Sequence, residues 1–270
     1  MKYIASIITM IFVVCFLSVG NVAIAQEQKS QEDSIFNSAK SSKDWNVMVG
    51  YKGWFNKWQT FSLYDNLTEP SETISSVSDT ELTNILVLGF SNKNSFISFS
   101  YMKTTYSFPN LSDKMDRQEG DMSLGYYINR YFGITAGLKI LSLEQKIKFS
   151  LYDYDYTYNL DQTFWGSTLG FVGLVPIGKK GFGFYNTFSY GVFLSDWYSD
   201  TATPVANSPY YVGELGISYS PRIQKHVKFL NSANVYAGYR FQNMYLKDIF
   251  KNEDGKYSTD GFVLGVNLSF

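Results

Sequence analysis

From Trp45 to the C-terminus, apolar side chains recur at every second position in one run after another. A β-strand turns successive side chains to opposite faces, so this period of two is typical of strands with one apolar face. Ten strands are predicted, at about residues 45–55, 82–91, 97–101, 122–128, 132–140, 163–175, 182–192, 211–219, 233–241 and 262–270. Two of them, 82–91 and 163–175, are apolar at both parities, so their faces stay unassigned. The pattern predicts an all-β chain.

The links between these strands alternate in length. Short links lie at 91–94, 129–131, 176–181 and 220–230, and long links at about 57–82, 108–120, 144–161, 195–208 and 247–260. An even number of strands, with short turns on one side and long loops on the other, is the layout of an outer-membrane barrel. We therefore expect residues 45–270 to form an antiparallel up-and-down transmembrane β-barrel of ten strands. Eight or twelve strands are the alternatives, since the link at 57–82 could hold a hairpin extension and merging the two strands of unassigned parity would give eight. A soluble secreted β-protein with two packed sheets is the alternative fold.

Charged residues in the middle of these strands all lie at the parity opposite to the apolar face. They are Lys52, Asp121, Lys139, Glu214 and Arg240. A charge that faced lipid at mid-membrane would cost roughly 2 to 4 kcal/mol, which explains the segregation. We expect these five residues to form a charge network in the lumen.

The register of two hairpins predicts which of these charges pair. Asp121 and Lys139 are each nine residues from Arg130, the centre of a tight turn, so they should face each other. Glu214 and Arg240 are symmetric about Val227 and are expected to pair in the same way, which leaves Lys52 without a partner. With Tyr127, Tyr185, Tyr210 and Tyr236 also inside, the lumen should be narrow or closed.

The N-terminal residues read as a targeting segment. Residues 1–25 have a lysine, an apolar run and the small-residue site Ala23-Ile24-Ala25, the pattern of a secretory signal peptide. Residues 26–44 are polar and are interpreted as a flexible periplasmic segment. The single cysteine, Cys15, lies in the signal peptide, so the mature chain should have no disulfide.

The C-terminal strand carries a second signature. Residues 261–270 end the chain on a phenylalanine, with apolar residues at every second position: Phe262, Leu264, Val266, Leu268 and Phe270. This segment resembles the C-terminal assembly signature of bacterial outer-membrane β-barrels, and residues 125–137 resemble the hairpins of small opacity-type and OmpX-like barrels. The resemblance implies a Gram-negative outer-membrane location, contact with lipid and lipopolysaccharide, and recognition by the barrel-assembly machinery during insertion. It implies no functional residue.

Charge is distributed unevenly between the two sets of links. The long links hold 18 of the 24 acidic residues and 8 basic ones, whereas the short links hold basic residues and no acid. Acidic outer loops could attract cations or join lipopolysaccharide phosphates through divalent ions, or they could simply be solvated. The net charge of −1 gives no basic field that would indicate nucleic-acid binding.

An outer-membrane hydrolase is the less favoured functional alternative. Omptin proteases need acidic pairs and a histidine at the extracellular end, but the single histidine here, His226, lies in a predicted periplasmic link. Asp153 and Asp155 form an alternating pair that fits one face of a loop extension as well as a catalytic pair. We expect no catalytic residue, no metal site and no cofactor. A porin-like or narrow channel for ions or small solutes is the favoured function, and a structural or adhesin-like barrel that acts through its acidic loops is the alternative.

Overall fold

The computed structural model describes residues 45–66, 69–92, 94–109, 114–151, 154–178, 180–197, 208–221, 229–250 and 253–270. The predicted signal peptide and the segment 26–44 therefore lie outside the described residues, as do Asp153 and His226. No helix in the described part of the chain is long and apolar enough to cross a membrane.

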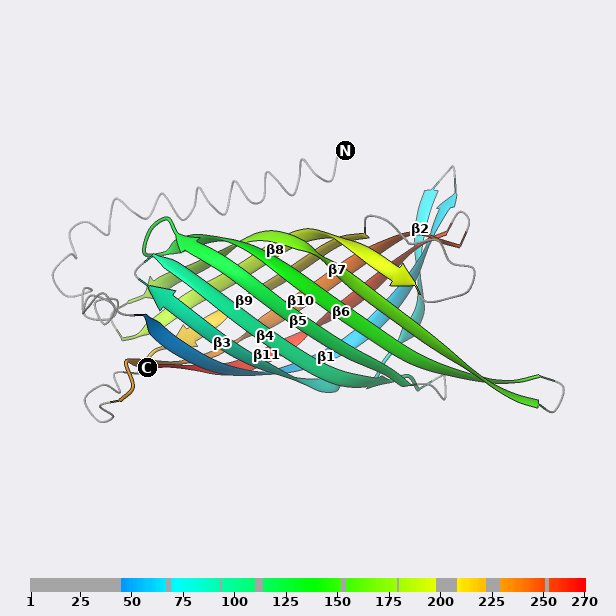
Figure 1. Ribbon diagram of the computed structural model, residues 1–270, viewed down its shortest axis with the longest axis horizontal. Helices are drawn as coiled ribbons and strands as arrows, with labels where there is room; N and C mark the ends of the chain where they lie inside the picture. The colour runs from blue at the N-terminus through cyan, green and yellow to red at the C-terminus, as the bar shows by residue number, and fades with distance from the viewer. Residues whose placement is uncertain are drawn as a thin grey trace. The chain divides into compact units, whose positions relative to one another are not determined.

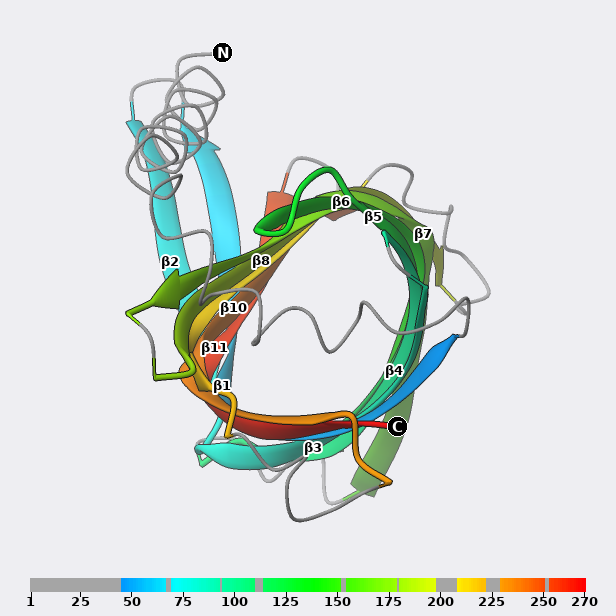
Figure 2. The same cartoon turned by 90° about the vertical axis from the view of Figure 1, so that its left-hand side faces the viewer.

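In these described ranges, eleven antiparallel strands make up one sheet (Figure 1). They are β1 (Asn46–Asn66), β2 (Glu69–Val77), β3 (Glu81–Asn92), β4 (Ser95–Ser107), β5 (Lys114–Tyr127), β6 (Phe132–Leu151), β7 (Tyr154–Ile177), β8 (Phe182–Trp197), β9 (Ser208–Tyr219), β10 (Ser232–Phe250) and β11 (Glu253–Ser269). Pairing of β11 with β1 closes the sheet, and the end view in Figure 2 shows the resulting ring. Because β2 pairs only with β1, ten strands form the barrel, as the sequence predicted.

The first strand changes its partner along its length. Residues 46–56 of β1 pair with β3, and residues 59–66 pair with β2. From Gln59 onward, β1 therefore turns away from β3 together with β2, while it stays paired with β11 as far as Tyr64, and Figure 2 shows this hairpin standing away from the ring. This is the hairpin extension that the long link at 57–82 left open.

Most of the predicted long loops are paired strand, which corrects the sequence interpretation. β5 already begins at Lys114, the hairpin of β6 and β7 stays paired as far as Leu151 and Tyr154, and β10 and β11 stay paired as far as Phe250 and Glu253. Beyond the hydrocarbon region the outer face of a strand no longer needs to be apolar. The alternation therefore fades while the backbone pairing continues. We call the end of the barrel at which these long hairpins project the hairpin end. The opposite end, which holds Trp45 and Phe270, is the terminal end.

The outer face of the barrel carries the apolar parity. Outward residues such as Ile134, Leu138 and Ile140 on β6 are about half exposed. The two strands of unassigned parity follow the same rule: Leu86 on β3 and Leu169 on β7 point outward. An exposed apolar surface of this extent is stable only against lipid. The outer surface of the barrel formed by residues 45–270 is therefore suited to a lipid bilayer.

Candidate functional site

Seven charged residues meet inside the barrel, and we call them the lumen charge network. They are Lys52 on β1, Arg117, Glu119 and Asp121 on β5, Lys139 on β6, Glu214 on β9 and Arg240 on β10. Each lies at the inward parity of its strand, opposite the lipid-facing residues. All five charges that the sequence placed in the lumen belong to it.

Both predicted ion pairs are present in the network. Asp121 and Lys139 are register partners, with 2.8 Å between Oδ2 and Nζ. Glu214 and Arg240 are also register partners, with 3.3 Å between Oε2 and Nη1. The tight turn between β5 and β6 fixes the first pair, and the longer link between β9 and β10 keeps the same register.

The expectation that Lys52 has no partner is wrong. Its Nζ lies 3.1 Å from Oε2 of Glu214, so this one carboxylate accepts from both Lys52 and Arg240. Because β1 and β9 are not neighbouring strands, the contact arises from the curvature of the barrel. Strand register alone gave no signal for it.

Glu119 is the centre of the network and was missed at the sequence level, where it was assigned to a long loop. Its carboxylate accepts from Arg117 Nη2 at 2.6 Å, from Lys139 Nζ at 2.5 Å and from Gln242 Nε2 at 2.8 Å, and Arg240 Nη2 lies 3.9 Å away. β5 and β10 lie five strands apart in either direction around the ten-stranded ring. Glu119 therefore joins opposite walls, and side chains meet across the lumen at this level.

Aromatic rings pack against the cations of the network. The guanidinium of Arg117 lies 5.2 Å from the ring centroid of Trp58, and that of Arg240 lies 5.1 Å from Trp54. The Nζ of Lys139 lies 5.4 Å from the ring of Tyr210. These contacts add electrostatic attraction where few waters can reach the charge. They also link the charges to the apolar interior.

An apolar cluster fills the lumen on the hairpin-end side of the network. It consists of Trp58, Tyr106, Phe108, Met115, Leu141, Leu143, Phe164, Phe193, Tyr210, Val212, Met244 and Leu246, with Tyr257 packed against it. These residues come from nearly every wall of the barrel, and the rings of Phe193 and Tyr210 stack at 4.5 Å. The outer half of the lumen is therefore a packed core, as the inward tyrosine at position 210 suggested.

The terminal-end side of the network is lined differently. Inward positions there carry small or hydroxyl side chains of intermediate exposure: Ser98, Ser100, Ser123, Thr135, Gly137, Thr187 and Ser189. The side chains of Lys52 and Asp121 are 20% and 21% exposed, whereas that of Glu119 is 4% exposed. Solvent therefore reaches the network from the terminal end, although four aromatic side chains also lie at inward positions on this side: Phe96, Tyr127, Tyr185 and Tyr236.

The remaining predicted residues are less connected. Asp155 lies in β7, but its side chain is outside what the structure describes. Among the described residues, no group of three or more His, Cys, Asp or Glu side chains could hold a metal ion.

The assembly signature lies on the outer face of β11, where Phe262 and Leu264 are exposed. Its last residue, Phe270, closes the seam, since its N–H donates to the carbonyl of Val47 at 2.8 Å.

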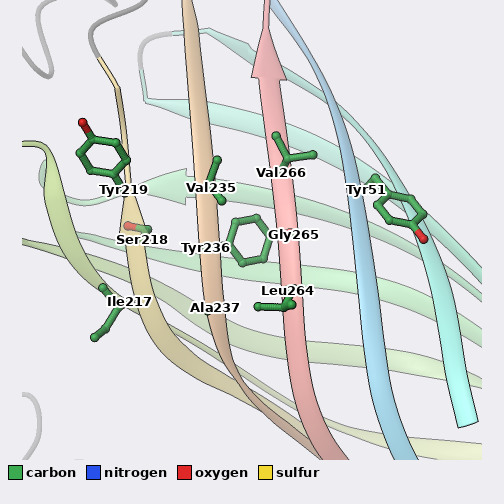
Figure 3. A pocket seen from close by; sticks show the side chains of 10 residues that line it. All are labelled: Tyr51, Ile217, Ser218, Tyr219, Val235, Tyr236, Ala237, Leu264, Gly265 and Val266. Carbon is green, nitrogen blue, oxygen red and sulfur yellow. The ribbon is translucent and has the colours of Figure 1, made fainter.

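A shallow depression of about 480 Å³ lies on the outer wall over β9, β10, β11 and β1 (Figure 3). Larger outward side chains, including Ile217, Val235 and Leu264, surround the small Ala237 and Gly265. Its lining is apolar and it faces the bilayer. The depression is therefore a feature of the lipid-facing wall, and Tyr236, whose ring Lys52 contacts, lies beneath it.

The fold resembles solved outer-membrane barrels, although no family model and no curated protein matches the sequence. The outer membrane protease OmpT from Escherichia coli matches with a TM-score of 0.55 and 11% identity, over 85% of this chain and 99% of that chain. The translocator domain of the autotransporter NalP from Neisseria meningitidis has a TM-score of 0.43 and 10% identity, over 93% of this chain and 98% of that chain. At these identities the likeness concerns the fold alone.

The closed ring, the apolar outer belt and the charge network inside the barrel lead to one assignment. A strand barrel satisfies every backbone hydrogen bond without a free edge, which is what a membrane-spanning sheet requires. Barrels with short turns at the chain termini and long hairpins at the other end are those of bacterial outer membranes. The chain is a small bacterial outer-membrane β-barrel.

Proposed function

We propose that this barrel is closed in its resting state and acts through the hairpins that project from its outer end. The observation that carries the proposal is the contact of Glu119 with Gln242 and Arg240 on the opposite wall. The apolar cluster lies directly beyond it. A solute on a straight path through the lumen would have to displace both layers.

Opening such a lumen is energetically costly. Glu119 and Arg117 are 4% and 0% exposed at their side chains, so separating them would leave buried charges without partners. Removal of one partner from a buried ion pair typically costs about 3 to 5 kcal/mol. The charge network therefore supports a structural closure in preference to a permanently open pore.

The projecting hairpins are the second support. Beyond Ile140 and Trp165, β6 and β7 continue as a pair for eleven residues each, which corresponds to roughly 36 Å of strand. This hairpin and the hairpin of β1 and β2 both project from the hairpin end of the barrel, where the acidic links of the sequence lie. We propose a non-catalytic surface role for them, with lipopolysaccharide or a neighbouring surface as partner and divalent cations between the acidic groups and the phosphates.

Planar-bilayer conductance of the refolded mature protein tests the closure. A heat-shift gel first establishes that the barrel is folded. We expect no discrete open levels for the natural sequence, and open levels for the double variant Glu119→Ala, Trp58→Ala, which removes one side chain from each layer. Stable open levels in the natural protein would contradict the proposal.

A shortened hairpin tests the surface role. Residues 147–158 are replaced by a two-residue turn between the register partners Lys146 and Asn159, which keeps the membrane wall intact. We expect a barrel of unchanged heat resistance that binds lipopolysaccharide vesicles more weakly in the presence of Mg²⁺. Unchanged binding would contradict a role for this hairpin.

A narrow channel remains the second candidate function. The small, accessible side chains of the terminal-end half favour it, because ions can reach the network from that side. In this case the natural protein would show brief openings at high voltage, and the reversal potential in a salt gradient would give the charge preference.

A further inference from the structure

The seven residues of the lumen charge network do not balance. Lys52, Arg117, Lys139 and Arg240 are cations, and three carboxylates, Glu119, Asp121 and Glu214, oppose them. The network therefore holds one positive charge in excess, inside a wall that faces hydrocarbon. Buried charge without compensation is costly, so a counter-charge within the lumen would be strongly favoured.

The excess is concentrated on one side of the network. Arg117 and Lys139 are balanced by Glu119 and Asp121, at distances between 2.5 and 2.8 Å. Lys52 and Arg240 share the single carboxylate of Glu214, and Glu119 is 3.9 Å from Arg240. The local surplus thus lies at Lys52 and Arg240.

Hydrogen-bond donors around this pair support the same conclusion. Within the described residues, Nε of Arg240, the indole N–H of Trp54 and the hydroxyl of Tyr236 have no hydrogen-bond acceptor, although all three atoms are buried. Arg240 lies over the ring of Trp54 at 5.1 Å, and Lys52 lies over the ring of Tyr236 at 5.5 Å. Donors and positive charge therefore gather in the same place.

This place can be reached from solvent. The side chains of Lys52 and Arg240 are 20% and 13% exposed, and small residues of β4, β5, β6 and β8 line the lumen opposite Tyr185 and Tyr236 on the terminal-end side. We propose that a small inorganic anion binds between Lys52 and Arg240, entering from the terminal end, and neutralises the lumen charge network. The site is separate from the surface role of the hairpins and does not depend on it.

The thermal stability of the refolded mature protein in detergent tests the proposal. Sodium gluconate is exchanged for sodium chloride, or for inorganic phosphate, at constant ionic strength. A ligand that binds only the folded state stabilises it in proportion to the logarithm of its concentration, so a rise of about 5 °C is expected at 100 times the Kd. Equal melting temperatures in gluconate, chloride and phosphate would overturn the proposal.

Charge-count variants make the test specific. Lys52→Met leaves three cations against three carboxylates, so the anion response should disappear. Asp121→Asn raises the excess to two, so the response should become larger. Lys103→Gln is the matched control, because Lys103 is exposed on the outer face of β4. Loss of the response in Lys103→Gln as well, or its persistence in Lys52→Met, would indicate general screening and reject the site.

A variant without a charge change covers the case in which Lys52→Met does not fold. Tyr236→Phe removes one donor and leaves the charge count intact. The concentration of chloride or phosphate that gives half of the stabilisation should rise several-fold. An unchanged half-point would argue against the assignment of the site to this side of the network.

Discussion

Lys139 contacts two carboxylates of the same strand: its Nζ lies 2.8 Å from Asp121, its register partner, and 2.5 Å from Glu119, two residues earlier in β5. The two carboxylates differ in exposure, since Asp121 is 21% exposed and Glu119 is 4% exposed at the side chain. Their contributions to the stability of the barrel should therefore differ.

Replacement of Glu119 by glutamine should be the more damaging change. It leaves Arg117 and Lys139 buried with one carboxylate fewer, and we expect the free energy of unfolding to fall by about 3 to 5 kcal/mol. Urea unfolding in detergent, monitored by tryptophan fluorescence, gives the value. Asp121→Asn is the comparison and should cost less, because the Asp121 side chain is 21% exposed and Lys139 keeps its contact with Glu119. Equal losses in the two variants would argue against Glu119 as the centre of the network.

A pair of glycine substitutions tests the packing of the seam between β1 and β11. A Cβ atom at Gly261 would overlap the carbonyl oxygen of Phe55, so Gly261→Ala should prevent seam closure or lower the melting temperature strongly. A Cβ atom at Gly120 would meet no atom within 4 Å. Gly120→Ala should therefore be neutral or stabilise by about 0.5 kcal/mol. Heat-shift gels of both variants compare them directly.

Three acidic residues lie side by side on neighbouring strands near the hairpin end. Glu144 on β6 is the register partner of Asp116 on β5 and of Asp161 on β7. Like charges directly opposite each other destabilise a sheet, so Glu144→Lys should stabilise the barrel by roughly 0.5 to 1 kcal/mol at low salt. The gain should shrink at high salt because of screening. A less stable Glu144→Lys protein would contradict the repulsion, and Glu144→Gln should lie between the two.

The assembly signature predicts an effect on insertion that is separate from stability. Phe270 is partly exposed, and its backbone makes the seam contact with Val47, so Phe270→Ala should leave the melting temperature of refolded protein nearly unchanged. In cells, the amount of folded barrel in the outer membrane should fall. Phe229→Ala removes the ring that stacks on Phe270 at 6.4 Å and serves as the control. Equal cellular levels of the two variants would argue against recognition of the terminal residue.

The ten barrel strands, and the faces of eight of them, could be predicted because the bilayer imposes alternation on outward positions. Residues 82–91 and 163–175 are apolar at both parities, so only the structure assigns their faces. The pair of Asp121 and Lys139 could be predicted because a tight turn at Arg130 fixes the register. Arg117 and Glu119 could not be predicted as lumen residues. Their outward neighbours are polar because they lie outside the hydrocarbon region of the bilayer, so the alternation that marks a strand face is missing there. One signal was present: Met115, Arg117 and Glu119 continue the inward parity of Asp121.

Contacts across the lumen are a different case. Lys52 meets Glu214, and Glu119 meets Gln242, through the curvature of a ring whose circumference depends on all ten strands. Strand register describes neighbours and carries no information about opposite walls. The size of the lumen, and with it the partner of Lys52, becomes definite only once the ring is closed.

The seam between β1 and β11 also sets the order of folding. Its register pairs Met48 with Ser269, residues that are separated by nearly the whole barrel sequence. Contacts between such distant residues carry a large loop-closure entropy and form slowly. Hairpins such as that of β6 and β7 can form early, whereas the ring closes last, after the final strand has been synthesised. Until that step, β1 and β11 both present unpaired edges, and the chain is then most prone to aggregate.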